Sequence, residues 1–221
     1  MLGNLFVRPR QNRCDTITDD PSIPGSECPV NHNVGDTYAY NDGDGTTLYD
    51  VEYPIQIGSF DPDFHDASLN VQPLPFAGMR DRYFLLNGRG YPDTANATVL
   101  STMDPLGTLQ PSQPVDSLVT AAPGQRILIR ISNLNITNFY TLGSNLPMQV
   151  VALDARLLRD GAGNNMYYTT NSLTLGGGQS ADVIITAPLT AGTYFLYSTN
   201  LDRLANDAEN FGGMMTEIRI N

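Results

Sequence analysis

Hydrophobic and polar residues alternate over short stretches of the chain, and clusters of Gly, Pro, Asn and Asp separate these stretches. Ile127, Ile129 and Ile131 fall on one face of an extended segment, and Ile218 and Ile220 do the same near the end of the chain. A period of two residues is typical of strands with one buried face. We predict strands at residues 37–40, 48–57, 83–87, 126–132, 149–154, 172–175, 181–186, 193–198 and 214–220. Many short strands of this kind indicate an all-β antiparallel sandwich or barrel.

One segment has helical spacing instead. Its apolar residues are Leu201, Leu204, Ala205, Ala208 and Phe211. Asn200 is a suitable N-cap, and Gly212-Gly213 is a suitable stop, so we predict one short helix between them. Residues 91–114, which are polar and contain several prolines, predict a long loop or an insertion.

Two glycine-rich segments are predicted to be turns. Residues 41–45, Asn-Asp-Gly-Asp-Gly, lie between two predicted strands and are typical of a hairpin. They faintly resemble a calcium loop, but the acidic residue that closes such a loop at its twelfth position is missing. Gly176-Gly177-Gly178 lies between strands and is not followed by the Lys-Ser or Lys-Thr of a phosphate-binding loop.

The beginning of the chain has a different pattern. Residues 2–7 predict a short strand that Pro9 ends, and residues 11–35 show almost no periodicity, which indicates a linker. An unpaired strand is an aggregation hazard unless something else covers it. We therefore predict that this strand does not pair inside the sandwich formed after Asp36.

Composition excludes several classes of function. The chain has 221 residues, which fits one large all-β domain or one domain with a long appendage. All twelve basic residues are Arg, and the net charge is -11, so nucleic acid is not expected as a partner. No apolar run approaches the roughly 18 residues that a membrane helix needs, so no membrane partner is expected.

The two cysteines, Cys14 and Cys28, lie in one stretch rich in Pro, Asp and Ser. A disulfide is the favoured interpretation, and two unconnected thiols in a reducing cell are the alternative. A bridge would close a loop of about 15 residues and indicate an oxidising compartment. The first residues do not form a secretory signal, so we expect either a mature form or a missing amino terminus.

The search for chemistry gives no catalytic, cofactor-binding or metal-ligating residue. His32 and His65 are far apart in sequence, and copper or zinc sites built on imidazole need two or three ligands. There is no G-x-S-x-G motif for nucleophilic catalysis. Asp61, Asp63 and Asp66 are a possible acid–base cluster, but 19 aspartates in the chain make such clusters expected by chance.

Several motifs in the same order together resemble a known family. They are residues 83–89 (Tyr-Phe-Leu-Leu-Asn-Gly-Arg), 122–133 (Pro-Gly, then an Arg-x-x-x-Arg strand ending in Asn), 148–155 (a strand carrying an Asp), 178–183 (Gly-Gln-Ser-Ala-Asp-Val) and 192–195 (Gly-Thr-Tyr-Phe). As a set they resemble the second, middle cupredoxin domain of multicopper oxidases, the laccase-like family. Each motif alone is weak. We interpret Arg126 and Asp182 as scaffold residues that satisfy the backbone or one another.

The resemblance implies a cupredoxin-like Greek-key β-sandwich or barrel. It divides the chain into residues 1–8, the C-terminal strand of a preceding cupredoxin domain, residues 9–35, a linker, and residues 36–221, the cupredoxin-like domain. Met1 then stands at the axial position of a type 1 copper site whose other ligands lie upstream, or it is only an initiator. Both interpretations stay open.

The resemblance also implies a function. The copper motifs of the family, His-x-His and His-Cys-His, are missing from this chain. The chain is therefore expected to be a scaffold domain of an oxidase that holds copper elsewhere and couples substrate oxidation to reduction of dioxygen. Flanking cupredoxin domains are the expected partners, a homo-oligomer is left open, and the expected location is extracellular or periplasmic. The alternative is a copper-free binding or surface module without redox activity.

Overall fold

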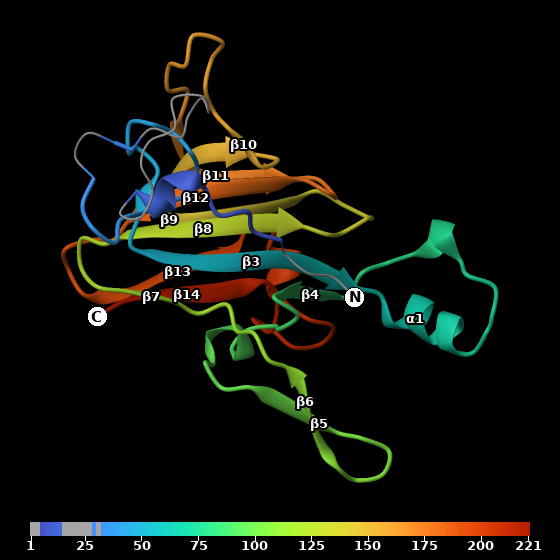
Figure 1. Cartoon of the computed structure of the whole chain (residues 1–221). Coiled ribbons are helices and arrows are strands. Elements are labelled where there is room, and N and C mark those ends of the chain that lie inside the picture. Colours follow the sequence, from blue (N-terminus) through green and yellow to red (C-terminus); the bar gives the residue numbers. More distant parts are fainter. Residues whose placement is uncertain (1–4, 15–27, 30–31) are drawn as a thin grey trace.

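The computed structural model describes residues 5–14, 28–29 and 32–221. In this part of the chain, ten strands form one sheet that curls on itself into two layers (Figure 1). The strands are β3 (Val51–Phe60), β4 (Tyr83–Leu86), β7 (Val119–Ala121), β8 (Arg126–Asn133), β9 (Tyr140–Leu153), β10 (Arg156–Leu157), β11 (Tyr168–Leu175), β12 (Ser180–Thr186), β13 (Gly192–Ser198) and β14 (Met215–Ile220). Their main order is β4-β3-β8-β12-β9-β13-β14-β7, and β10 and β11 also pair with β9.

The long strand β9 connects the two layers. Its residues 149–153 pair with β12, and its residues 142–144 pair with β13. Most neighbours are antiparallel, but β3 pairs with β8 in parallel, and β7 pairs with β14 in parallel. The all-β prediction is confirmed.

The layer that contains β8 has a hydrophobic core on each of its two faces, because side chains alternate along its strands. Ile127, Ile129 and Ile131 point into the main core between the layers, as the sequence predicted. Leu128, on the opposite face of β8, packs in a smaller core. The hairpin of β1 (Thr37–Tyr38) and β2 (Leu48–Tyr49) covers this second core with Tyr49. Because both faces of β8 are covered, its alternation in sequence is partly lost.

The predicted hairpin turn at residues 41–45 is confirmed. Thr37 lies opposite Tyr49 in the antiparallel pair. Asp42 closes the turn, since its Oδ1 accepts the Gly45 N–H at 2.9 Å and its Oδ2 accepts the Thr47 N–H at 2.6 Å. A side chain that bonds its own backbone in this way is a common turn device.

The one α-helix of the described residues is not where the sequence placed it. It is α1 (Pro62–Leu69), which begins at the N-cap Asp61 and buries none of its residues, so it shows no apolar stripe. The predicted segment forms only the short 3₁₀ helix η4 (Leu201–Leu204), capped by Asn200 as expected. Beyond it, Asp207 and Phe211 adopt positive φ angles of 50° and 62°, which no helix tolerates.

The segment at residues 91–114, predicted as a long loop or an insertion, is not a loop throughout. It contains the 3₁₀ helix η3 (Asp93–Ala95) and a separate hairpin of β5 (Leu100–Met103) and β6 (Leu109–Gln113) that projects from the body (Figure 1). The other short 3₁₀ helices are η1 (Arg10–Arg13) and η2 (Phe76–Gly78). No helix in the described part of the chain is both long and apolar enough to cross a membrane.

Only part of the predicted N-terminal strand and linker lies in the described residues. Residues 1–4, Met1 among them, lie outside, and residues 5–7 belong to no strand. Within the predicted linker, Gln11 is buried and bonded to the hairpin turn: its amide donates to Asp42, and its Oε1 accepts the Gly43 N–H. The division into a preceding strand, a linker and a main domain stays a prediction.

Candidate functional site

Three adjoining hollows surround the loop of residues 134–139, which joins β8 to β9. Their volumes are about 570, 560 and 340 Å³. The largest, which we name the Asp81 hollow, is lined by Met79, Arg80, Asp81, Phe84, Thr137, Asn138, Asn200, Asp202 and Arg203. A concave surface where a few charged groups converge among aromatic and apolar ones is the default candidate for a binding site.

Asp81 lies just before β4 and is held by hydroxyl groups from three other elements. Its Oδ2 accepts hydrogen bonds from Ser59 of β3 at 2.7 Å, from Thr137 of the loop, and from Tyr140 of β9 at 3.4 Å. Burial raises the pKa of Tyr140, so this hydroxyl stays a donor at neutral pH. The three bonds converge on one oxygen, which leaves Oδ1 to accept a bond from a bound molecule.

Arg203 supplies the cationic side of the Asp81 hollow. Its Cζ lies 4.3 Å from the centroid of the Tyr140 ring, and its Nη1 donates to the Phe139 carbonyl at 2.6 Å. The η4 turn places it there. Stacking on the ring and a bond to the backbone hold the guanidinium beside the loop, where it lines the hollow.

Contacts with Asn133 and Gly177 hold the loop of residues 134–139 in place. The buried Asn133 side chain donates to the Leu175 carbonyl at 2.7 Å and accepts the Asn135 N–H at 3.0 Å. Gly177 packs so closely that a Cβ there would lie 2.1 Å from the Asn135 carbonyl oxygen. The glycine turn predicted from sequence is therefore a support for the rim of the hollow. Ile136 and Phe139 on this rim are 83% and 70% exposed.

A fourth hollow, of about 400 Å³, lies where residues 5–7 cross β8. The Phe6 ring centroid lies 5.4 Å from Cζ of Arg130, while Leu5 and Val7 on either side are 91% and 81% exposed. Arg8 then forms an ion pair with Glu52. The segment thus presents one side chain to the domain and two apolar side chains outward.

Beneath this segment lies a network of charged side chains that are largely buried. Arg130 bridges Glu52 at 2.5 Å and Asp182 at 2.6 Å, and the Tyr40 hydroxyl donates to Asp182 at 2.6 Å. Burial raises the pKa of Asp182 in spite of its ion pair. Burial also raises the pKa of Tyr40, and Asp182 adds to the rise, so Tyr40 remains the donor.

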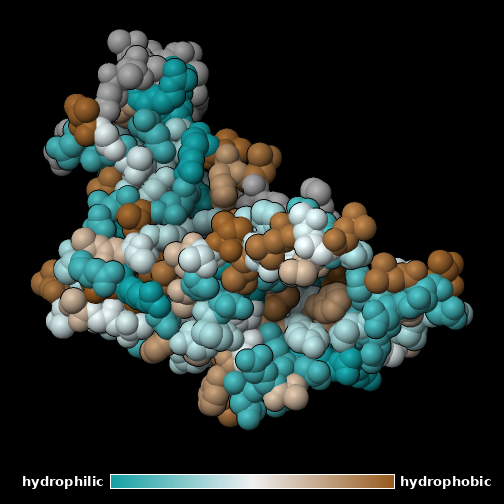
Figure 2. Space-filling view, turned by 90° about the horizontal axis from the view of Figure 1, so that it is seen from below, coloured by the Kyte–Doolittle hydropathy of each residue, from teal (hydrophilic) through white to brown (hydrophobic). Residues whose placement is uncertain are grey.

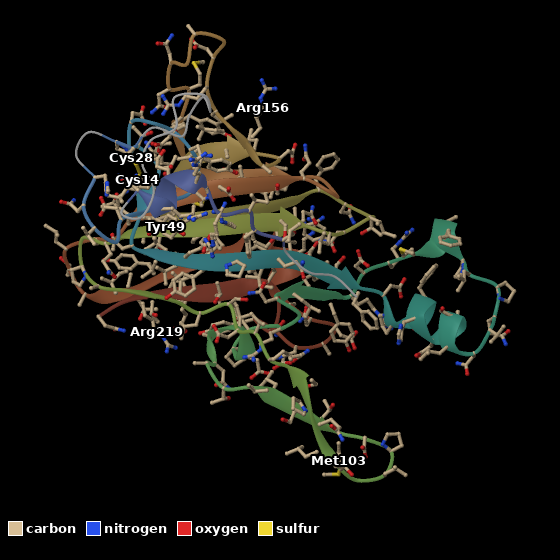
Figure 3. All side chains as sticks on the ribbon, in the orientation of Figure 1. Cys14, Cys28, Tyr49, Met103, Arg156 and Arg219 are labelled. Atoms are coloured by element: carbon tan, nitrogen blue, oxygen red, sulfur yellow. A yellow bond between two sulfur atoms is a disulfide. The ribbon has the colours of Figure 1, made fainter. Side chains whose placement is uncertain are left out.

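Most of the residues noted in the sequence have structural roles. Cys14 and Cys28 form the predicted disulfide, with their Cα atoms 5.7 Å apart (Figure 3). Asp61 caps α1, and Asp63 pairs with Arg82 at 2.9 Å. His65 lies on α1 with its ring 5.1 Å from that of Phe60, and His32 precedes β1.

Arg126 and Asp182 were expected to satisfy the backbone or one another, and of these alternatives Arg126 takes the backbone. Arg126 donates to the carbonyls of Leu48 and Thr46, at 2.6 and 2.7 Å, whereas Asp182 pairs with Arg130. Both are scaffold residues, as expected. Asp81 and Arg203 were missed, because nothing in the sequence distinguishes them from the other aspartates and arginines until the loop is folded beside them.

The comparison with family profiles identifies one family, and solved structures show a similar fold. A profile of the multicopper oxidase family matches residues 67–215. No curated protein matches the sequence. Among solved structures, the fold is similar to a blue copper oxidase from Nitrosomonas europaea, with a TM-score of 0.56, 14% identity, and coverage of 76% of this chain and 43% of that enzyme.

Two further structures support the same fold. A laccase from Botrytis aclada gives a TM-score of 0.50 and 21% identity over 80% of this chain and 30% of the laccase. A copper nitrite reductase from Nitrosomonas europaea gives 0.53 and 16% identity over 82% of this chain and 53% of the reductase. The chain therefore spans about half or less of each structure's length. The predicted cupredoxin-like β-sandwich is confirmed.

Proposed function

Because the chain belongs to the multicopper oxidase family, we propose that it is the middle, non-copper-ligating cupredoxin domain of a larger oxidase. In the whole protein, oxidation of a reducing substrate would be coupled to reduction of dioxygen to water, and the copper of the flanking domains would supply that redox chemistry. This domain would act as a scaffold that holds its neighbours at working distance.

The proposal that this domain binds no copper rests on its histidines and cysteines. Type 1 copper takes a thiolate and two imidazoles, and a sulfur engaged in a disulfide is no thiolate. The chain has two histidines and two cysteines, and both cysteines form the disulfide. In the described ranges, no three His, Cys, Asp or Glu side chains lie close enough together to hold a metal ion. The residues of this chain do not fit the copper of the family.

Two surfaces support the scaffold role. The exposed Leu5 and Val7 above the Arg130 network suit contact with a preceding domain, and the ion pair of Arg8 with Glu52 anchors that segment. The Asp81 hollow would form one wall of the cleft for the reducing substrate. There Asp81 Oδ1 would accept a hydrogen bond from the substrate, and the exposed Phe139 would contact its apolar part.

The predicted disulfide also bears on location. A bridge of this kind persists in oxidising compartments, so we place the whole protein outside the cell or in a periplasm.

Copper loading tests the proposed function. The 221-residue chain, incubated with copper and then desalted, should hold no stoichiometric metal and oxidise neither phenols nor diamines. The chain produced together with the flanking domains of its own reading frame should bind copper and show activity. The reading frame upstream of residue 1 should encode His-Cys-His.

Two results would contradict this. One is stoichiometric copper with intense absorption near about 600 nm in the chain alone, which is typical of thiolate-bound type 1 sites. The other is a reading frame without copper motifs on either side. The second result would favour a copper-free binding module.

A further inference from the structure

The sequence contains two Asn-x-Thr motifs, residues 96–98 (Asn-Ala-Thr) and residues 135–137 (Asn-Ile-Thr). A motif of this form, with x other than proline, is the acceptor for N-linked glycans in secreted proteins, and its asparagine has to lie on the surface. The surroundings of the two asparagines therefore decide which motif can be used.

Asn96 lies on the surface. It follows η3 and precedes β5, at the base of the β5–β6 hairpin that projects from the body (Figure 1). The side of the molecule on which this hairpin projects faces the viewer in Figure 2 and mixes hydrophilic with hydrophobic residues. Asn96 itself is partly exposed, residues 97–99 are exposed, and Val99 is 53% exposed. The chain around the motif is therefore accessible.

The amide nitrogen of Asn96 is free to carry a substituent. The side-chain Oδ1 accepts the Thr98 N–H at 3.0 Å and the Thr98 hydroxyl at 2.8 Å. Both bonds end on the oxygen, and Nδ2 donates to no other group in the part of the chain that the structure describes. A sugar on Nδ2 would therefore break no hydrogen bond of the fold.

The backbone holds Asn96 in this position. Its carbonyl accepts a hydrogen bond from the buried Arg89 at 2.6 Å, and its N–H donates to the Asp93 carbonyl at 3.2 Å. The fold thus uses the main chain of this residue and leaves the side chain at the surface.

Asn135 has the same motif but opposite surroundings. It is 5% exposed, its Nδ2 donates to Asn133 Oδ1 at 2.7 Å, and its Oδ1 accepts the Ser59 hydroxyl. Its carbonyl lies against Gly177. With so little of the residue exposed, a glycan on Nδ2 could not reach solvent unless the loop of residues 134–139 opened and lost these contacts.

We propose that Asn96 is the N-glycosylation site of this chain and that Asn135 is not glycosylated in the folded protein. The donor is an oligosaccharide linked to a lipid pyrophosphate. Nδ2 of Asn96 attacks the anomeric carbon of the first sugar and forms an N–C bond, while the bond from that carbon to the pyrophosphate oxygen breaks. The lipid pyrophosphate leaves with the electron pair, and a base accepts one amide proton, so no oxidant or reductant is needed.

The disulfide supports this inference. The bond between Cys14 and Cys28 indicates an oxidising compartment, and N-glycans are found on proteins that pass through one. The inference therefore rests on the oxidising compartment that we propose for the whole protein, and not on its copper chemistry.

The glycan would also restrict how the whole protein assembles. A bulky, hydrated group at the base of the hairpin keeps other domains away from that side. We therefore expect η3 and the base of the hairpin to face solvent rather than a flanking domain.

Peptide mass spectrometry of the protein from its own source is the direct test. An amidase that releases N-glycans converts the modified asparagine to aspartate, so the position of each glycan can be read from the peptides. This change should be found at position 96 and not at position 135.

Variants of the 221-residue chain, secreted from a eukaryotic host, test which groups are needed. The original chain should lose the mass of one glycan on treatment with the amidase. Thr98→Ala removes the hydroxyl of the first motif and should abolish the glycan, whereas Thr98→Ser keeps a hydroxyl and should retain it. Thr137→Ala is the matched change in the second motif and should leave the glycan in place. Circular dichroism checks that each secreted variant is folded.

An unmodified Asn96 in the protein from its own source would overturn the proposal, as would a glycan on Asn135 or a glycan that persists in Thr98→Ala. The state of Cys14 and Cys28 is read from unreduced peptides of the same sample. An intact disulfide beside an unmodified Asn96 would overturn this inference and leave the proposed compartment standing. Free thiols beside a glycan on Asn96 would support the inference and contradict the argument for location from the disulfide.

Discussion

At the scale of single residues, two charged side chains hold neighbouring elements together. Asp182 pairs with Arg130, which the strand register places directly opposite it on β8. Arg89 was noticed in the sequence only as part of a motif. It is fully buried. Its guanidinium holds the base of the β5–β6 hairpin in place by donating to the carbonyls of Asp93, Asn96, Thr98 and Gln113.

Gly177 gives a prediction at this scale. Gly177→Ala should lower the free energy of unfolding by about 1–3 kcal/mol, because the added Cβ meets the Asn135 carbonyl and the backbone has to move. The rim of the Asp81 hollow should move with it. Urea denaturation measures the stability, and changes in the amide spectrum of residues 134–139 report the displacement.

Gly161→Ala is the control for this change. A Cβ at Gly161 meets nothing within 4 Å, so its free energy of unfolding should change by less than about 0.5 kcal/mol. Equal effects of the two substitutions would contradict the close approach of Gly177 to the loop.

At the scale of elements, alternation predicted the strands of the core well and the exposed elements poorly. The segments at residues 126–132 and 181–186 correspond to β8 and β12. The first half of β9 was missed, because Gly143, Asn145 and Pro147 break its pattern. β5, β6 and α1 were missed because exposed elements carry no period of burial. The cap of α1, an Asp followed by Pro, was a signal that could have found the helix.

The cap gives a prediction for α1. The Asp61 carboxylate accepts the N–H groups of Asp63 and Phe64, and its other oxygen accepts the Arg80 N–H at 2.7 Å. The bond from Arg80, followed by those within the cap, lowers the pKa of Asp61 below its usual 3.8. Asp61→Ala should cost about 1 kcal/mol and speed hydrogen exchange in α1, whereas Asp61→Asn, also a good cap, should cost less.

The pH dependence follows from the direction of the shift. A carboxyl whose pKa is lowered by folding stabilises the fold above its unfolded pKa, and that contribution is lost as pH falls through the lower, folded value. Protection of α1 should therefore hold above pH 3.8 and decline below it. A decline that is the same in Asp61→Ala would show that another group is responsible.

At the scale of the whole molecule, the sequence predicted the sandwich but not the order of its strands. The parallel neighbours β3 and β8 are separated along the chain by β4, the β5–β6 hairpin and β7. Their pairing therefore could not be predicted from their order in the sequence. The described part of the predicted linker makes contacts with the hairpin of β1 and β2. Gln11 is buried, and Asn12 accepts the Tyr38 N–H at 2.7 Å, so η1 holds the hairpin that covers the second core.

The disulfide therefore contributes to the stability of the whole domain. It closes a loop with a sequence separation of 14, and cross-linking a loop of that size removes unfolded-state entropy worth about 3 kcal/mol. The bridge also ties η1 to the chain that leads into β1, so its loss would loosen the cover over Leu128 and Val151. A double Cys14→Ser, Cys28→Ser variant should lose about 2–4 kcal/mol in urea denaturation, with a somewhat steeper dependence on denaturant, because the unfolded chain without the bridge exposes more surface. The original chain under a thiol reductant should match the variant. If reduction left the midpoint where it was, the bridge would serve the linker alone, and the anchoring of η1 by Gln11 and Asn12 would suffice to hold the hairpin.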